Sequence, residues 1–291
     1  MNYGLIEVKP EDLREQDWRL GEKNDARNVV LQEDRSFQPF LPVFEQQKKA
    51  FETAGCVSFS ALNCIETYII RVYGAEYNFS DRYTANVSGT IPGVGNYLHK
   101  VAESIRKDGL VLERDYQYNS KTLEEYYEPI PQSIQDGAKD FYKDFDIQLQ
   151  WVDSVISSAE KLWEALSFAP IQVTGYAWTE SPDGTHHRVD RLRNHAFMLF
   201  AGNYGAYWLI YDHYDKSIKR LSWDYNFGAA IQYTAHHKTE SAYPFKLVQG
   251  RGDKDIFAVD VLGERFRINN MSALQEGHRR KLWGDIGDIE M

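Results

Sequence analysis

The sequence predicts an α+β fold in which a mainly helical part precedes a mainly β part. Between residues 54 and about 166, apolar residues recur at helical spacing, whereas runs rich in β-branched and aromatic residues follow Pro170. Helices followed by strands favour an α+β or two-lobed arrangement over an alternating parallel sheet. The chain has 291 residues, of which 43% are hydrophobic, so it can bury a sizeable core.

The N-terminal part of the chain divides into a lead-in and a helical lobe. Residues 1–45 are polar and irregular, end in a proline-punctuated extended segment, and are expected to wrap the β-rich lobe. Residues 46–166 are expected to form the mainly helical lobe. Its first helix begins near Cys56, carries apolar residues at helical spacing, and ends before Gly74. Further helices are predicted over residues 97–107, closed by Gly109, and over residues 149–166.

The β-rich lobe is expected over residues 167–249, and a C-terminal extension over residues 250–291. Apolar runs in the lobe predict strands at 171–176, 195–200, 207–211 and 219–223. The extension predicts a hairpin of residues 256–261 and 265–268, followed by a short helix opened by Ser272 with Gln275 as its capping-box partner.

Charge and composition exclude several classes of partner. The chain carries 33 Lys and Arg against 43 Asp and Glu, and this net charge of −10 offers no basic footprint for nucleic acid or an anionic membrane. No apolar run approaches the ~20 residues of a membrane span, and no export signal of the usual kind is visible. We therefore expect a cytoplasmic protein, whose oligomeric state stays open.

The two cysteines have different sequence surroundings. Cys56 follows Gly55 in the expected first turn of its helix, where the helix dipole and free backbone N–H groups stabilise a thiolate. Cys64 lies two turns further along, roughly 12 Å away at the helical rise, so the pair cannot form a disulfide while the helix is intact. A lone cysteine is more often a buried core residue than a nucleophile, and this interpretation suits Cys64.

The β-rich lobe offers a base for Cys56 and a group to orient that base. His195 begins one apolar strand and Asp212 ends the next, and the connection Gly202-Asn203-Tyr204-Gly205 is typical of a hairpin. If the turn is symmetric, the numbers of cross-strand partners sum to 407 and His195 faces Asp212. Each residue alone is more often structural, so the interpretation depends on their occurrence together with Cys56.

Four segments, in order, resemble motifs of papain-like cysteine peptidases of the C1 type. They are Pro42-Val43-Phe44-Glu45-Gln46, Gly55-Cys56-Val57-Ser58-Phe59-Ser60-Ala61, Asn194-His195-Ala196, and the strand from Tyr207 to Tyr214. Weaker resemblances lie at Phe79-Ser80-Asp81-Arg82 and Gly93-Val94-Gly95. The resemblance covers roughly residues 40–225. It implies a two-lobe fold in which an active-site cleft separates a helical lobe from an antiparallel, barrel-like β lobe.

The resemblance also implies a peptide or protein substrate and roles for individual residues. The catalytic set would be Cys56 as nucleophile, His195 as base, Asp212 as the orienting residue and Gln46 as a side-chain donor in the oxyanion hole. The expected substrate-binding residues are Gly93, Gly95 and Asn194. No cofactor is expected. No metal is expected either, because no cysteine or second carboxylate completes a ligand set for His186 and His187.

The departures from the family pattern lie beside the same residues. Val57 replaces a tryptophan, Asp212 an asparagine, and Tyr214 the tryptophan that shields that amide. Gln46 lies ten residues before Cys56, four more than in the family, so residues 47–53 are expected to loop out, with Gln47 as a fallback donor. The family's disulfides are absent, which resembles its intracellular bacterial or phage-encoded members. No helical propeptide of family length is recognised before Gln46, so activation by propeptide removal is not expected.

Two other functions stay open. One is hydrolysis of amide bonds in peptidoglycan peptides, which Cys-His hydrolases also cut, although the acidic composition argues mildly against binding to cell walls. The other is a catalytically silent papain-like protein with a binding or structural role, for which Val57 and Tyr214 leave room.

Overall fold

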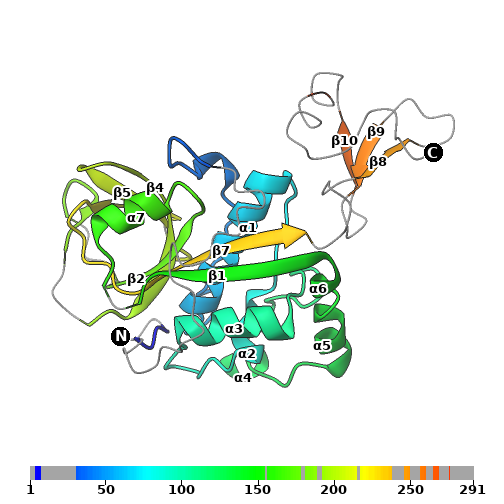
Figure 1. Ribbon diagram of the computed structural model, residues 1–291. Coiled ribbons are helices and arrows are strands. Elements are labelled where there is room, and N and C mark those ends of the chain that lie inside the picture. The colour runs from blue at the N-terminus through cyan, green and yellow to red at the C-terminus, as the bar shows by residue number, and fades with distance from the viewer. Residues whose placement is uncertain are drawn as a thin grey trace. The chain divides into compact units, whose positions relative to one another are not determined.

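The computed structural model describes residues 4–7, 31–154, 156–177, 181–188, 192–214, 217–237, 246–249, 256–259, 265–268 and 275 (Figure 1). The chain divides into two compact units. One comprises Met1–Phe141 with Ile147–Ala235, and the other comprises Tyr142–Asp146 with His236–Met291. Among the described residues, no helix combines the length and the apolar character needed to span a bilayer.

The described strands β1 to β7 form one mixed sheet, in the order β1-β7-β2-β4-β5-β6-β3. Its strands are β1 (Phe145–Asp153), β2 (Ile171–Gly175), β3 (Thr185–His186), β4 (His195–Asn203), β5 (Tyr207–Tyr211), β6 (Ile218–Ser222) and β7 (Ala230–His237). The pairs β2–β7, β2–β4, β4–β5 and β5–β6 are antiparallel, whereas β3 runs parallel to β6. This α+β architecture is the one that the sequence predicts.

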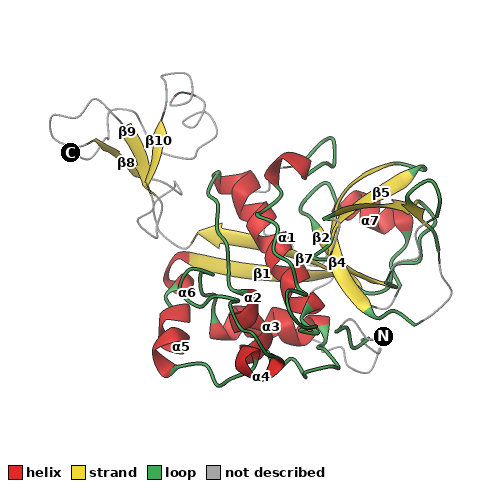
Figure 2. Ribbon diagram, turned by 180° about the vertical axis from the view of Figure 1, so that it is seen from behind, coloured by secondary structure: helices red, strands yellow, loops and turns green. Residues whose placement is uncertain are grey.

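The helices are α1 (Cys56–Tyr73), α2 (Asp81–Val87), α3 (Leu98–Asp108), α4 (Leu123–Tyr126), α5 (Gln132–Ala138), α6 (Phe141–Asp144) and α7 (Ala159–Ala165), with a 3-10 turn at Gln38–Phe40. The long helix α1 contacts α2 and α3 as well as β2 and β4, and it runs between the helical and β-rich parts in Figure 2. Its position therefore brings its first residue close to the sheet.

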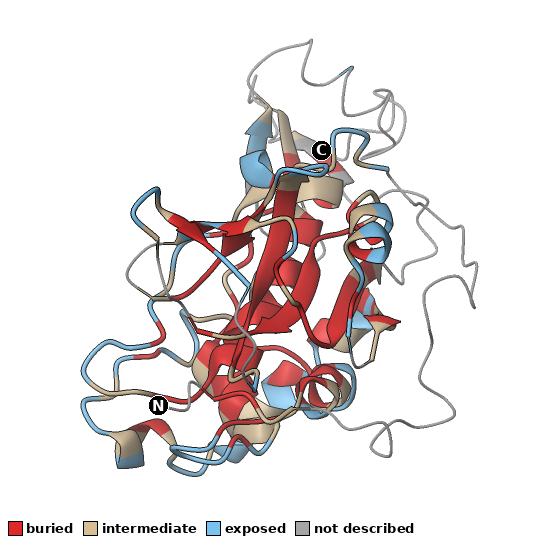
Figure 3. Ribbon diagram, turned by 90° about the vertical axis from the view of Figure 1, so that its left-hand side faces the viewer, coloured by how far each residue is buried: buried red, intermediate tan, exposed pale blue. Residues whose placement is uncertain are grey.

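Helix α1 is buried on more than one side, and its buried residues include polar ones such as Ser58, Glu66 and Thr67. Most of its residues are buried, including both cysteines. Figure 3 shows such buried residues gathered in the interior of the described part of the chain. Gly74 ends it with a left-handed φ of 69° and an N–H bond to the carbonyl oxygen of Ile70. The predictions of α1, of its glycine stop and of α3 are confirmed.

The helix predicted over residues 149–166 is wrong. Strand β1 continues to Asp153, and α7 begins only at Ala159. Its N-cap is Ser158, whose side chain accepts a hydrogen bond from the Lys161 N–H. The apolar residues of this stretch therefore follow the two-residue period of a strand first and the 3.6-residue period of a helix afterwards, and an N-cap serine separates the two elements.

The second unit contains an antiparallel sheet of described strands in the order β10-β9-β8. These strands are β8 (Lys246–Gln249), β9 (Ile256–Val259) and β10 (Arg265–Ile268). The predicted pairing of residues 256–261 with 265–268 is confirmed for the described strands, and β8 is an addition that the sequence reading did not predict. The hairpin turn and the helix start at Ser272 lie outside the described residues.

The lead-in is tied to the β-rich part by backbone hydrogen bonds. The N–H of Gln32 donates to the Ser167 carbonyl, and the N–H of Phe37 donates to the Phe200 carbonyl, at 2.8 and 2.9 Å respectively. Further along, the Tyr211 hydroxyl donates to the Pro42 carbonyl over 3.1 Å. These hydrogen bonds hold residues 32–42 against the β-rich part, ahead of the start of α1.

Candidate active site

Cys56 is the first residue of α1 and is completely buried. Two residues earlier, Ala54 has a left-handed φ of 56°, and its N–H donates to Glu52 Oε1 over 3.0 Å. Burial raises the pKa of the Cys56 thiol well above its usual value, and the charges of Glu52 and Asp212 add to this effect. A hydrogen bond from the Ala196 backbone opposes it. The thiol is therefore neutral at rest and needs a base to become a nucleophile.

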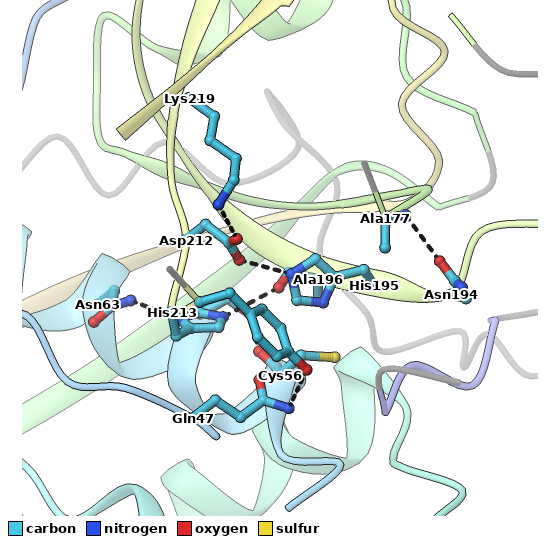
Figure 4. Close-up of polar contacts among 12 residues, drawn as sticks. Gln47, Cys56, Asn63, Ala177, Asn194, His195, Ala196, Asp212, His213 and Lys219 are labelled. Atoms are coloured by element: carbon cyan, nitrogen blue, oxygen red, sulfur yellow. Dashed lines mark hydrogen bonds and ion pairs between the residues drawn. The ribbon is translucent and has the colours of Figure 1, made fainter. Parts of the chain in front are cut away.

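His195 begins β4 and lies opposite Gly175 of β2. Its Nε2 is 2.7 Å from Asp212 Oδ1, and both side chains are fully buried. Because Ala196, the next residue, hydrogen-bonds the Cys56 thiol, the start of β4 and the start of α1 meet here. Figure 4 shows Cys56 below His195, with Asp212 on the other side of the imidazole.

The contact between His195 and Asp212 arises from a different register than the sequence predicts. Observed partners are Met198 with Tyr211 and Leu199 with Ile210, so the partner numbers sum to 409 instead of 407. The turn is one residue shorter than predicted, because β4 extends to Asn203 and β5 begins at Tyr207, and a bulge follows at Leu199/Ala201. Asp212 is thus a diagonal rather than a direct neighbour of His195, a distance that longer side chains span.

Asp212 has a second partner that the sequence interpretation missed. Lys219 of β6 places its Nζ 2.6 Å from Asp212 Oδ2, and this pair is also buried. Burial alone would raise the pKa of Asp212, but the neighbouring His195 and Lys219 outweigh it and hold the pKa below its usual value. The carboxylate is therefore ionised.

His213 lies beside this group but is held in its neutral form. Burial lowers its pKa to about 4. Its Nδ1 is 3.2 Å from the Asn63 amide nitrogen and its Nε2 is 3.3 Å from the Ala196 carbonyl. Since the amide can only donate, Nδ1 accepts and Nε2–H donates.

Donor atoms of His195, Asp212 and His213 lie within 4.8 Å of one another, a spacing that could hold a metal ion. The Lys219 ammonium on Asp212 would repel a cation there, and the hydrogen bonds of His213 already use both ring nitrogens. This group therefore fits a hydrogen-bonded cluster better than a metal site.

The glutamine that joins this buried group is Gln47 rather than Gln46. The Gln46 side chain is exposed, whereas Gln47 is fully buried and its N–H donates to the His213 carbonyl over 2.9 Å. The Gln47 Nε2 donates to Glu52 Oε1 over 2.6 Å and to the Tyr214 hydroxyl over 3.0 Å. Residues 47–53 do not simply loop out as expected, because the two ends of this insertion, Gln47 and Thr53, fold into the interior.

Tyr214 packs against the imidazole and links it to this loop. Its ring centroid lies 5.3 Å from that of His195, and its hydroxyl donates to Glu52 Oε2 over 2.8 Å. Tyr214 therefore covers the His195 imidazole with an aromatic ring.

The three expected substrate-binding residues have different surroundings in the structure. Gly93 is exposed in its turn, and Asn194 accepts a hydrogen bond from the Ala177 N–H over 3.0 Å through its side-chain oxygen. Gly95 has a φ of 114°, and the backbone of Gly4 packs so closely against it that a side chain at residue 95 would collide. The chain's own N-terminal segment therefore fills the space beside Gly95.

Residues 4–7 form a short bridge in this space. The N–H of Asn96 donates to the Gly4 carbonyl, and the N–H of Ile6 donates to the Asn96 carbonyl, at 2.9 and 2.8 Å respectively. The backbone of Gly4 also packs against Ala54, and Arg193 Nη1 is 2.9 Å from Glu7 Oε1. This segment thus spans from the residues before Cys56 to the residues before His195.

Solved structures with this fold are cysteine proteases. The digestive procathepsin L2 proteinase of Tenebrio molitor larval midgut has a TM-score of 0.53 and 14% identity, covering 80% of this chain and 78% of that chain. Digestive procathepsin L 3 of the same larval midgut has a TM-score of 0.51, 14% identity, and coverages of 75% and 74%. The chain has a papain-like fold. The predicted fold class is confirmed.

A third structure with this papain-like fold is the clostridial cysteine protease Cwp84 after propeptide cleavage. Its TM-score is 0.53 at 15% identity, and the match covers 72% of this chain and 58% of that chain. At the level of sequence, no protein-family model and no curated protein matches the chain. The likeness is therefore one of fold, and the chemistry has to be argued from the site itself.

The sequence analysis missed two residues of the site, Lys219 and Glu52, and only Lys219 has a signal in the sequence. Lys219 shares a strand face with Leu221, so any register that buries Leu221 also turns Lys219 inward. Glu52 lies in the insertion before Cys56, and no local pattern indicates that its carboxylate returns to the Gln47 amide.

Proposed function

We propose that the protein is a cysteine peptidase that hydrolyses peptide bonds through Cys56, His195 and Asp212. The observation that carries the proposal is the buried pair of His195 and Asp212 on β4 and after β5, adjacent to a cysteine at the start of α1. The papain-like fold, which the chain shares with solved cysteine proteases, supports the proposal. A peptide or protein is the proposed substrate, and no cofactor is invoked.

In the proposed first half-reaction, the Cys56 thiol gives its proton to Nδ1 of His195, because Nε2 is directed to Asp212. The sulfur attacks the peptide carbonyl carbon, and the carbonyl oxygen becomes an oxyanion. The Cys56 backbone N–H and the Gln47 side-chain amide would donate to it. His195 then passes the proton to the leaving amine as the C–N bond breaks, which leaves a thioester on Cys56.

In the second half-reaction, a water molecule gives a proton to His195 and attacks the thioester carbonyl. The C–S bond breaks, the acid product leaves, and the proton returns to the Cys56 sulfur. Asp212 accepts a hydrogen bond from His195 Nε2 throughout, which fixes the ring and stabilises its charged form.

We assign the side-chain part of the oxyanion hole to Gln47 in place of Gln46. The exposed Gln46 side chain has no described contact with the cluster, whereas Gln47 is buried and contacts Tyr214, which packs on His195. Without substrate, the Gln47 side-chain amide donates its hydrogen bond to Glu52 Oε1. The substrate oxyanion would have to replace this carboxylate oxygen as the acceptor.

Iodoacetamide labelling and peptidase assays on Cys56→Ala and Cys64→Ala test the proposal. Both cysteines are buried in α1, so the two variants are matched in helix and in size change. We expect fluorogenic peptide hydrolysis and labelling to disappear in Cys56→Ala and to persist in Cys64→Ala. Turnover that survives Cys56→Ala in a correctly folded protein would refute the proposal.

One observation favours a second candidate function, a silent papain-like binding protein. The thiol is fully buried and the Gln47 amide is already bonded to Glu52 and Tyr214. The same labelling experiment separates the two functions, because a silent protein would leave Cys56 unlabelled in the presence of every peptide tested.

A further inference from the structure

Lys219 occupies a core-facing position in β6. The strand pairs with β5 so that Lys219 lies opposite Ile210, and alternate residues face inward and outward. Ile218 is exposed while Lys219 and Leu221 are buried. The register therefore exposes an isoleucine and buries a lysine, which reverses the usual preference of both residue types. A buried ammonium is costly unless it is paired, so Nζ requires a partner in this register.

Asp212 is that partner, and its carboxylate joins two side chains. Oδ2 lies 2.6 Å from Lys219 Nζ, and Oδ1 lies 2.7 Å from His195 Nε2. The Lys219 and Asp212 side chains are 4% and 0% exposed, so water does not screen the pair. With each oxygen directed to a different donor, the carboxylate cannot rotate without losing a bond. Figure 4 shows Lys219, Asp212 and His195 in this sequence.

We propose that Lys219 is a positioning residue, which fixes Asp212 and cancels its charge so that the pair orients His195 without adding net negative charge beside Cys56. The proposal rests on the proposed function, in which His195 exchanges a proton with the cysteine. An uncompensated carboxylate at this place would disfavour the negatively charged Cys56 thiolate.

Apart from the Lys219–Asp212 pair, the charged or titratable groups named here do not compensate a negative charge on Cys56. His213, next to Asp212 in the chain, is neutral, since its burial disfavours the charged form. From the loop before α1, Glu52 faces Cys56 and hydrogen-bonds Tyr214, and its negative charge acts in the same direction as that of Asp212. Without the Lys219 ammonium, the thiolate would therefore form beside two uncompensated carboxylates.

A charge-balanced double variant provides the test. Lys219→Met leaves Asp212 without its ammonium, Asp212→Asn leaves Lys219 buried without a counter-charge, and Asp212→Asn with Lys219→Met removes both charges while keeping an acceptor oxygen for His195. Circular dichroism and thermal melts check that each protein folds. The readouts are the pH dependence of Cys56 alkylation by iodoacetamide and kcat/KM on a fluorogenic peptide.

We expect the pH of half-maximal alkylation to rise by about one unit in Lys219→Met, because the lost charge no longer favours the thiolate. Asp212→Asn should lower kcat/KM by about tenfold or more. The kcat/KM of the double variant should be at least about tenfold higher than the value expected if the losses of the two single variants multiplied. A role in stability alone would lower the melting temperatures and leave the pH dependence unchanged. That result, or a double variant that simply multiplies the single losses, would overturn the proposal.

Failure of the proposed function is distinguishable from failure of this inference. If the wild type shows no alkylation at Cys56, the peptidase proposal fails. The proton on His195 Nε2 can still be followed by its downfield NMR signal. That signal should move in Lys219→Met and return toward the wild-type position in the double variant, whereas no change in either variant would contradict a positioning role for Lys219.

Discussion

The Gln47 side-chain amide donates a hydrogen bond to Glu52 Oε1 over 2.6 Å, so the proposed oxyanion donor is held by a carboxylate. The same carboxylate accepts from the Tyr214 hydroxyl, and Tyr214 covers His195. Glu52 thus connects the donor, the aromatic cover and the loop before Cys56. Its negative charge also raises the pKa of the Cys56 thiol, after the larger effect of burial.

Replacing this charge should make the thiol easier to ionise. In Glu52→Gln the side chain keeps its size and an acceptor for Gln47, while the negative charge is lost. We expect the alkylation of Cys56 to reach half of its maximal rate at a lower pH than in the wild type. Glu124→Gln, an exposed change in α4, is the matched control. An unchanged pH dependence in Glu52→Gln would show that Glu52 does not oppose thiolate formation.

Substitution of the two neighbouring glutamines distinguishes the oxyanion donors. Removing one such donor typically lowers kcat by about 100-fold or more, so Gln47→Ala should show a loss of this size with peptide substrates. Gln46→Ala should stay near the wild-type rate, because its side chain is exposed. Equal losses in both variants, measured by steady-state kinetics on folded protein, would contradict the assignment to Gln47.

The segment from Gly4 to Glu7 should compete with substrate if peptides bind beside Gly95. It bonds to Asn96, packs on Ala54 and is anchored by the ion pair of Glu7 with Arg193. Glu7→Ala removes the anchor without touching the proposed catalytic residues. We expect KM for a peptide substrate to fall several-fold while kcat changes little. A KM that equals the value for the Glu124→Gln control would indicate that the segment lies outside the path of the substrate.

The sequence determined those parts of the site that depend on local pattern. Cys56 at the start of a helix follows from the apolar period and from Gly74, and both are found in α1. His195 and Asp212 follow from two neighbouring strands and a short connection, although the predicted register was wrong. The correct pair emerged because a long side chain reaches a diagonal neighbour as well as a direct one.

The remaining parts depend on contacts between distant segments, which local pattern does not specify. The choice between Gln46 and Gln47 is decided by the path of the insertion, whose ends are buried through contacts such as the Tyr118 hydroxyl on the Gln47 carbonyl. The role of Lys219 depends on the register of β6 against β5. The division of residues 149–166 into β1 and α7 depends on which residues reach the sheet.

A group of carboxyl side chains that includes Glu66 of α1 and Asp81 of α2 should make stability depend on pH. Glu66 and Asp81 are buried, and burial, followed by the charges of neighbouring carboxylates, raises the pKa of each. Burial raises the pKa of Glu113 to about 7, with a further contribution from Glu45. Because the folded state prefers these groups protonated, their contribution to stability is present below their unfolded pKa values and is lost as the pH rises through their folded values.

For Glu113 this loss falls between the usual glutamate pKa, about 4.5, and about 7. Glu113→Gln keeps the acceptor for the Tyr118 N–H and cannot ionise. Urea unfolding of both proteins between pH 5 and pH 8 should show the free energy of unfolding of the wild type decreasing relative to Glu113→Gln as the pH rises. The difference between the two proteins cancels groups such as Asp212, whose lowered pKa acts in the opposite direction. A difference that stays constant over this range would mean that Glu113 is already ionised in the folded protein at pH 5.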